Sequence, residues 1–140
     1  MIFLDTSILV EILRKNLSIL TTIESFGVTP LVTSEICIME LIFGLHANKH
    51  LSSQSERLKS KLSDIEKLSS KLIVLPFDHK SAFKTGEIMG SLKLSGNIID
   101  FRDGMIACTA LANGITQIFS LNISHFERIP EVVIINKEKF

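Results

Sequence analysis

The 140-residue sequence predicts one α/β domain: a three-layer sandwich with a central parallel sheet of about four to five strands and helices on both faces. Two observations carry this prediction. Short runs rich in Ile, Leu and Val alternate with longer segments at helical spacing, and no repeat, low-complexity tract or linker interrupts the chain. Strands separated by helices pair in parallel through right-handed crossovers, so we expect a single domain over residues 1–140.

The apolar runs and the residues that end them place the elements. Strands are expected at residues 2–4, 31–32, 72–77, 115–119 and 132–135, the third stopped by Pro76. Helices are expected at residues 7–15, 35–47, 53–71, 79–94 and 103–113, with a helix or loop at 17–26. Either Thr33 or Ser34 can cap the helix that follows the second strand, and Gly96 and Gly114 are natural stops.

The composition excludes several classes of protein. Hydrophobic residues make up 46% of the chain, which excludes disorder, and no apolar run approaches the roughly 20 residues of a membrane span. Asp5 interrupts the N-terminus too early for a signal peptide, so we expect a cytoplasmic protein. Cys37 and Cys108 lie in apolar patterns without CxxC spacing, which predicts buried free thiols and no structural zinc.

The formal net charge is zero, but the charges are unevenly distributed. Residues 1–46 carry a net charge of −3, residues 47–93 of +4, and residues 94–140 of −1. A neutral total argues against a dedicated nucleic-acid binder, whereas the basic middle third would allow a local clamp on a backbone. The favoured interpretation of residues 56–71 is a solvated helix face.

A carboxylate stands at the first junction between strand and helix. Asp5 follows the apolar run "MIFL" and precedes Thr6 and Ser7, where the helical pattern begins. In open parallel sheets this junction is where ligands bind, but Asp, Thr and Ser are also good helix caps. The stretch alone leaves both roles open.

A second carboxylate lies inside an apolar helix. Glu40 is surrounded by Ile, Leu, Met, Cys and Phe in "EICIMELIFGL", and a helix that is apolar all round is expected to be buried. Glu40 should then find little water, which favours a functional acid over a buried ion pair. Glu35, in the first turn, needs no more than the helix dipole to explain it.

Two further segments carry polar residues of the same kind. Asp100 and Asp103 open a second apolar helix, and spacing does not say which caps it and which acts chemically. Ser120 and Asn122 follow the strand at 115–119. Well-separated carboxylates and an amide, with no histidine among them, suit a hard cation such as Mg²⁺ or Mn²⁺. No Ser-His-Asp set and no glycine-rich phosphate loop competes.

Taken together, four segments resemble the PIN domain, and more closely VapC-type toxins of toxin–antitoxin pairs. The resemblance covers essentially the whole chain and rests on the order of the motifs, since no single one is specific. The segments are "MIFLDTSILVEIL", "TSEICIMELIFG" with Glu40 and Gly44, "DGMIACTALANG" with Cys108 in place of an alanine, and "FSLNISHF" with Ser120, Asn122 and Phe126.

The resemblance implies a PIN-like fold and an RNA-cleaving enzyme. Asp5, Glu40, Asp103 and Asn122 would be the catalytic and metal-binding residues, with Mg²⁺ or Mn²⁺ as cofactor and transfer or ribosomal RNA as substrate. Thr6, Ser7, Asp100 and Ser120 would be accessory. Either Arg102 or a lysine of the basic middle third would contact the substrate phosphate. Asn122 stands where Asp is also frequent, which weakens a second metal position. The resemblance also implies an antitoxin partner and a homodimer.

Two other functions remain as alternatives. A catalytically silent PIN-like module would bind RNA or protein without cutting, which Asn122 favours and the three acids oppose. A phosphatase-like or receiver-like domain would use Asp5 as a phosphorylated acid. The first would carry another Asp where Ser7 stands, and the second an acid pair and a strand-end Lys, so both are disfavoured.

Overall fold

The computed structural model describes residues 1–136 and contains a five-stranded sheet in which every strand pairing is parallel. The strand order is β3-β2-β1-β4-β5. The strands are β1 (Ile2–Leu4), β2 (Leu31–Ser34), β3 (Ile73–Leu75), β4 (Gln117–Phe119) and β5 (Val133–Ile135). The predicted α/β fold is therefore confirmed, while the last four residues of the expected domain, 137–140, lie outside the described residues.

Eight helices connect the strands within the described part of the chain. They are α1 (Thr6–Leu13), α2 (Leu17–Ser25), α3 (Glu35–His46), α4 (Lys49–Ser52), α5 (Ser55–Ser69), α6 (His79–Leu94), α7 (Phe101–Ala112) and α8 (Ile123–Phe126). The bounds of α6 match the prediction, and the passage at 17–26 is a helix. The single-turn helices α4 and α8 were not expected, because four residues carry too little periodicity to be recognised.

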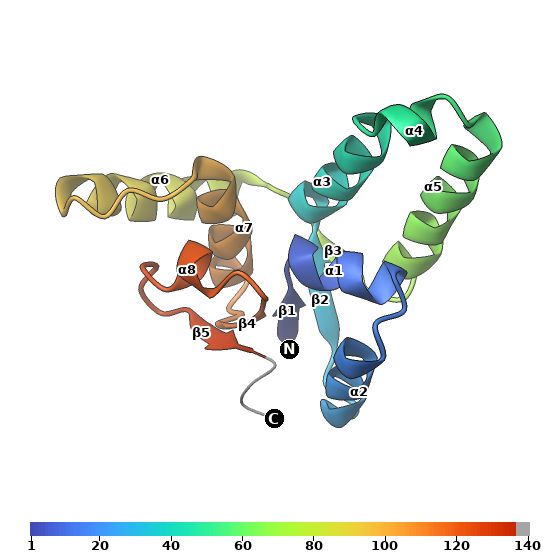
Figure 1. The fold of residues 1–140 in the computed structure, drawn as a ribbon. Coiled ribbons are helices and arrows are strands. Elements are labelled where there is room, and N and C mark those ends of the chain that lie inside the picture. The colour runs from blue at the N-terminus through green and yellow to red at the C-terminus, as the bar shows by residue number, and fades with distance from the viewer. Residues whose placement is uncertain (137–140) are drawn as a thin grey trace.

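The helices form two layers with the sheet between them (Figure 1). Helices α1 to α5 lie on one side, where α3 packs against α1 and α5. Helices α6, α7 and α8 lie on the other side, and α6 packs closely along α7. Gly104 allows that approach, because a Cβ atom there would overlap the Met89 side chain.

Apolar residues of the strands form the centre of the core. Phe3, Leu4, Ile118 and Phe119 are fully buried, and the Phe26 ring meets Phe119 edge to face with centroids 5.5 Å apart. Cys37 and Cys108 are buried free thiols, as predicted. No helix within residues 1–136 is both long and apolar enough to span a bilayer.

Helix α3 departs from the expectation that it would be buried all round. Ile36, Cys37 and Leu41 face the core, but Met39 and Phe43 are 51% and 66% exposed. The sheet and its neighbouring helices cover only one side of α3, so an apolar face remains at the surface. The prediction of a nearly water-free Glu40 was therefore wrong, since Glu40 is only half-buried.

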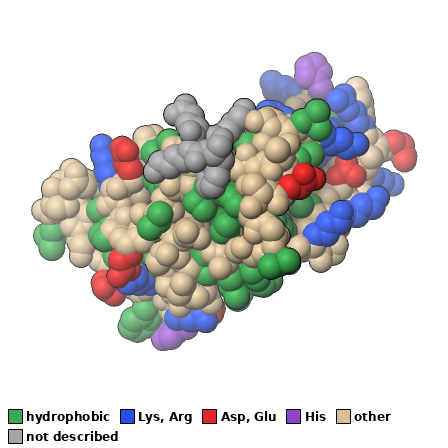
Figure 2. Space-filling model, turned by 90° about the horizontal axis from the view of Figure 1, so that it is seen from below, with side chains coloured by type: hydrophobic (Ala, Val, Ile, Leu, Met, Phe, Trp, Pro, Cys, Tyr) green, Lys and Arg blue, Asp and Glu red, His purple; other side chains and the backbone are tan. Residues whose placement is uncertain are grey.

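The basic middle third of the sequence is divided between α4 and α5 at one end of the molecule and α6 on the other side of the sheet. Seen from below, Lys and Arg side chains gather at the end formed by α4 and α5 (Figure 2). Helix α5 carries a single fully buried residue, Ile65, and most of its polar side chains are exposed. The part of the uneven charge that α4 and α5 carry thus forms a basic surface at this end.

Candidate functional site

The candidate site lies at the carboxyl ends of the two central strands. The chain proceeds outward from β1 through β2 to β3 on one side, and from β4 to β5 on the other. The strand order therefore reverses between β1 and β4, and ligands bind in the crevice at such a switch point. Asp5 directly follows β1 and Ser120 directly follows β4, so both side chains reach this crevice.

Asp5 is held by a set of hydroxyl and amide donors. Its Oδ1 accepts hydrogen bonds from Ser7 Oγ at 2.5 Å and from the Ile8 amide at 3.3 Å, and the latter caps α1. Its Oδ2 accepts from Ser120 Oγ at 2.6 Å, a contact across 115 residues of sequence. Burial raises the pKa of Asp5, although the hydrogen bonds from Ser120, Ser7 and Ile8 oppose that rise. Capping and a chemical role are thus compatible at this residue.

The neighbouring segment after β4 is tied to the same carboxylate. Ser120 Oγ also accepts from the Asn122 amide at 2.9 Å, and the Leu121 amide donates to Ser7 Oγ at 3.0 Å. These bonds lock the start of α1 to the end of β4. They place the main chain of Asn122 beside Asp5, while its side chain makes no capping bond to α8.

Glu40 approaches the site from α3. Its Oε1 accepts a hydrogen bond from Thr6 Oγ1 at 3.0 Å, which joins α3 to the first residue of α1. Ser34 begins α3 by accepting from the Cys37 amide at 3.3 Å, so Ser34 rather than Thr33 is the cap. Thr6 therefore orients Glu40, while Ser7 orients Asp5.

Asp100 and Asp103 have different environments. Asp100 caps α7 through the Arg102 amide at 2.9 Å, so this helix begins at Phe101 rather than at Asp103 as expected. The Asp103 carboxylate, in the first turn, lies 3.1 Å from His125 Nδ1. Burial raises the pKa of Asp103, and the facing His125 opposes that rise. Asp100 is thus the cap, and Asp103 points toward α8.

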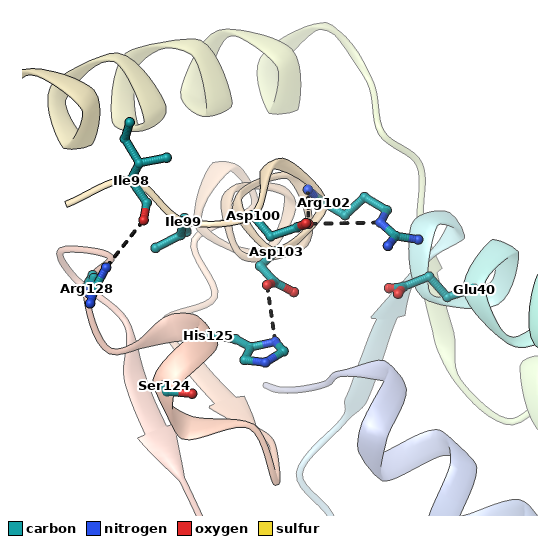
Figure 3. Close-up of a pocket in the computed structure, with 9 residues that line it drawn as sticks. All are labelled: Glu40, Ile98, Ile99, Asp100, Arg102, Asp103, Ser124, His125 and Arg128. Atoms are coloured by element: carbon teal, nitrogen blue, oxygen red, sulfur yellow. Dashed lines mark hydrogen bonds and ion pairs between the residues drawn. The ribbon is translucent and has the colours of Figure 1, made fainter. Parts of the chain in front are cut away.

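A pocket of about 400 Å³ brings several of these side chains together (Figure 3). Asp103 and His125 lie at its centre, Glu40 enters from α3, and the Arg102 guanidinium points toward Glu40. Arg128 is positioned by a 3.3 Å hydrogen bond from its Nη1 to the Ile98 carbonyl. The pocket therefore combines carboxylates with two arginines, which suits binding of a phosphate group beside a cation.

The predicted residues form one region but not a closed ligand shell. Glu40, Asp100, Arg102 and Asp103 line the pocket, with Ile98, Ile99, Ser124, His125 and Arg128. Asp5 is buried beside it, and the side chains of Ser120 and Ser7 hold Asp5. Within residues 1–136, no three His, Cys, Asp or Glu side chains are gathered as closely as a bound metal ion requires.

Two residues of the pocket that can carry charge were missed from sequence. His125 and Arg128 come from α8 and the turn after it, in the stretch "NISHFER". No histidine was expected among the proposed metal ligands, but α8 turns His125 onto one of them, Asp103. The available signal was the position of both residues just after a strand end, at the edge of the sheet where Asp5 was already expected.

Comparison with known proteins agrees with this geometry. The PIN domain profile matches residues 2–132. VapC ribonuclease Y4jK of Sinorhizobium fredii is 33% identical over 81% of this chain and 82% of its own. The tRNA(fMet)-specific endonuclease VapC of Salmonella typhimurium is 36% identical over 72% of this chain and 70% of its own.

A solved structure shows the same arrangement of the chain. DNA-bound VapBC from Salmonella typhimurium superposes with a TM-score of 0.82 at 28% identity, covering 97% of each chain. The profile match, the two relatives and this likeness extend over most of the sequence. The chain therefore belongs to the PIN-domain family and, within it, to the VapC proteins.

Proposed function

We propose that this protein is a metal-dependent endoribonuclease, the toxin of a toxin–antitoxin pair, that hydrolyses phosphodiester bonds of transfer or ribosomal RNA. The observation that carries the proposal is that Glu40 and Asp103 line one pocket of a PIN fold, while Asp5 follows the central strand β1 at the switch point of the sheet. Two of the relatives support the activity, since one is named a ribonuclease and the other a tRNA-specific endonuclease.

The donor atoms fit a hard divalent cation such as Mg²⁺ or Mn²⁺. Asp5, Glu40 and Asp103 offer carboxylate oxygens, and Asn122 adds an amide oxygen. Burial raises the pKa of both Asp5 and Asp103, and a cation nearby would favour their ionised forms. No Lys or Arg within residues 1–136 pairs with Asp5, so its charge is not already balanced.

Each of the three carboxylates has its own orienting group. Ser7 and Ser120 hold Asp5, Thr6 holds Glu40, and His125 holds one oxygen of Asp103. When bound, the cation supplies Lewis-acid activation of water and neutralises charge on the phosphate. Because these hydrogen bonds already orient the carboxylates, less free energy is needed to arrange them around a cation.

The two arginines of the pocket are placed to bind the substrate phosphate. The ion pair of Arg102 with Asp100 is long, with the Arg102 Nε 4.0 Å from Asp100 Oδ1, and the Arg102 side chain is 56% exposed. Arg128 uses one nitrogen on the Ile98 carbonyl and keeps its other donors available. We assign substrate binding to Arg102, as expected from sequence, and add Arg128.

The partners follow from the same family. We propose an antitoxin partner, which the solved VapBC structure supports, and a homodimer. The exposed Met39 and Phe43 on α3 offer apolar surface for one of these contacts. A cytoplasmic location fits an enzyme that acts on transfer or ribosomal RNA.

The test is cleavage of a mixed transfer and ribosomal RNA pool by the purified chain with Mg²⁺, Mn²⁺ or EDTA. We expect cutting that requires the metal and disappears in Asp103→Asn. A matched control is Glu66→Gln, which removes an exposed carboxylate of α5 that does not line the pocket and should retain activity. Absence of cutting with every metal, together with no metal binding by calorimetry, would instead favour the silent binding module.

A further inference from the structure

A groove of about 580 Å³ adjoins the candidate site between α1, α3, α4 and α5. We call it the α5 groove. The lining residues that matter here are Thr6 and Arg14 of the α1 side, Glu40 and Gly44 of α3, and Arg57 and Lys61 of α5.

The α5 groove is continuous with the pocket that contains Asp103. Glu40 lines both, and the Thr6 hydroxyl that binds Glu40 belongs to the groove. A polymer whose cleaved bond lies beside Glu40 and Asp103 can therefore continue into the groove. An RNA substrate necessarily extends beyond the bond that is cut.

The basic side chains of the groove, Arg14, Arg57 and Lys61, outnumber its two carboxylates, Glu40 and Asp64. Arg57 and Lys61 lie four residues apart on α5, so they share one face of the helix. Neither forms an ion pair with any acid among residues 1–136. Lys61 is half-buried, where an unpaired ammonium group is costly, and a phosphate would balance it. Arg14 is already paired with Glu11 at 3.3 Å.

The groove is also open where it meets α3. A Cβ atom at Gly44 would touch nothing within 4 Å, so space lies directly above this turn of the helix. Val10, Leu41 and Leu45 give the walls an apolar component that suits ribose and base faces. The combination of an apolar wall and cations on the opposite helix matches a single strand of nucleic acid.

We infer that the α5 groove binds the sugar–phosphate backbone of the RNA on one side of the cleaved bond, with Arg57 and Lys61 contacting phosphates. This inference rests on the proposed ribonuclease function, because the groove leads to Glu40. Binding of a protein segment in the same groove is the competing outcome of the experiment below.

The first measurement is RNA binding without cleavage. In the Asp103→Asn background, anisotropy of a fluorescein-labelled tRNA transcript gives Kd across a range of salt concentrations. Arg57→Gln/Lys61→Gln should weaken binding roughly tenfold and lower the slope of log K against log salt by about 1.4 to 2. The matched control is Lys59→Gln/Lys67→Gln, which removes the same charge from exposed positions of α5 outside the groove and should leave Kd within about twofold.

A second variant fills the groove without changing charge. Gly44→Trp projects a large side chain into open space, and Gly44→Ala is its control. We expect weaker RNA binding and a higher KM for cleavage with Trp and not with Ala, while far-UV circular dichroism confirms that both remain folded. Calorimetric Mn²⁺ binding should be unchanged in all groove variants, because none removes a proposed ligand.

The outcomes separate this inference from the proposed function. If the unmodified chain cuts no RNA, the proposed function fails. If it cuts RNA but both groove variants bind tRNA as the controls do, the inference is overturned. Unchanged RNA binding with loss of binding to the purified antitoxin would assign the groove to a protein partner instead.

Discussion

Replacement of Ser120 by Ala tests how the fold keeps Asp5 in place. Ser120 Oγ donates to Asp5 Oδ2 at 2.6 Å in a buried setting, and Asp5 is only 3% exposed. Alanine leaves that oxygen without its hydroxyl donor. A hydrogen bond to a charged group contributes about 1.5–3 kcal/mol, so we expect unfolding free energy to fall by that amount near neutral pH. For a chain of this size Tm should drop by about 5–10 °C.

The pH dependence of the loss identifies its cause. Because burial raises the pKa of Asp5 above 3.8 in the folded protein, the protonated form is favoured by folding and stability declines as pH rises through that folded pKa. Ser120→Ala raises the pKa further, since it removes the hydrogen bond that opposes burial most. The difference between variant and parent is therefore largest above both folded pKa values. This difference in unfolding free energy shrinks as pH falls, and it starts to shrink at a pH above the ordinary pKa of a carboxyl group.

A matched Ser–Asp pair elsewhere in the chain provides the control. Ser81 Oγ donates to Asp78 Oδ1 at 2.8 Å, and the hydrogen bonds from Ser81 lower the pKa of Asp78. The contribution of that pair is present above pH 3.8 and is lost only as pH falls through the lowered folded value. The effect of Ser81→Ala should thus persist to a lower pH than that of Ser120→Ala.

The assay is urea unfolding in EDTA at a series of pH values, from about 8 to about 3.5, for parent and both variants. Ser120→Ala without loss of stability at neutral pH would refute the claim that this hydroxyl stabilises the Asp5 carboxylate. If the stability loss of Ser120→Ala stayed constant down to the pH at which the loss of Ser81→Ala also disappears, the raised pKa of Asp5 would be refuted.

Three further outcomes are expected. Gly104→Ala should destabilise the chain by about 1–3 kcal/mol in thermal unfolding, because the new methyl overlaps Met89 where α6 packs on α7; an unchanged Tm would contradict that close packing. Thiol reagents should label Cys37 and Cys108 only as the protein unfolds in urea, since both are buried and burial raises the pKa of Cys108 to about 11; rapid labelling in native buffer would be inconsistent. Mg²⁺ at about 100 times its Kd should stabilise the folded chain by about 2.7 kcal/mol, and Asp5→Asn should reduce this shift; an equal shift in both proteins would place the ion elsewhere.

Much of the fold followed from local pattern. The run at 2–4 and the helix at 79–94 match their predicted bounds, because apolar runs, the Asp78 cap and the stop at Gly96 are all short-range signals. The start of α7 was misplaced because two residues could cap this helix. Asp100 was one of two candidates for α7, and only its bond to the Arg102 amide decided between them.

The candidate site depended more on tertiary structure. Asp5, Glu40 and Asp103 could be singled out one at a time, since each acid stands at a strand end or in an apolar helix. Of their orienting groups, Thr6, Ser7 and Ser120 were expected only through the family resemblance, since Ser120 reaches Asp5 across 115 residues of sequence. His125 was missed, because it reaches Asp103 only through the turn of α8. Such contacts depend on the place of β4 beside β1, which no local pattern encodes.

The sequence by itself determined the alternation of strands and helices, the buried thiols and the acids that stand out from an apolar background. Tertiary structure alone decided the strand order, the exposed apolar face of α3 and the joining of Glu40 to both the pocket and the α5 groove. The physical reason is the range of the forces involved. Propensity and periodicity act within a few turns of chain, whereas burial and hydrogen bonding at the site require segments that meet only when the sheet has formed.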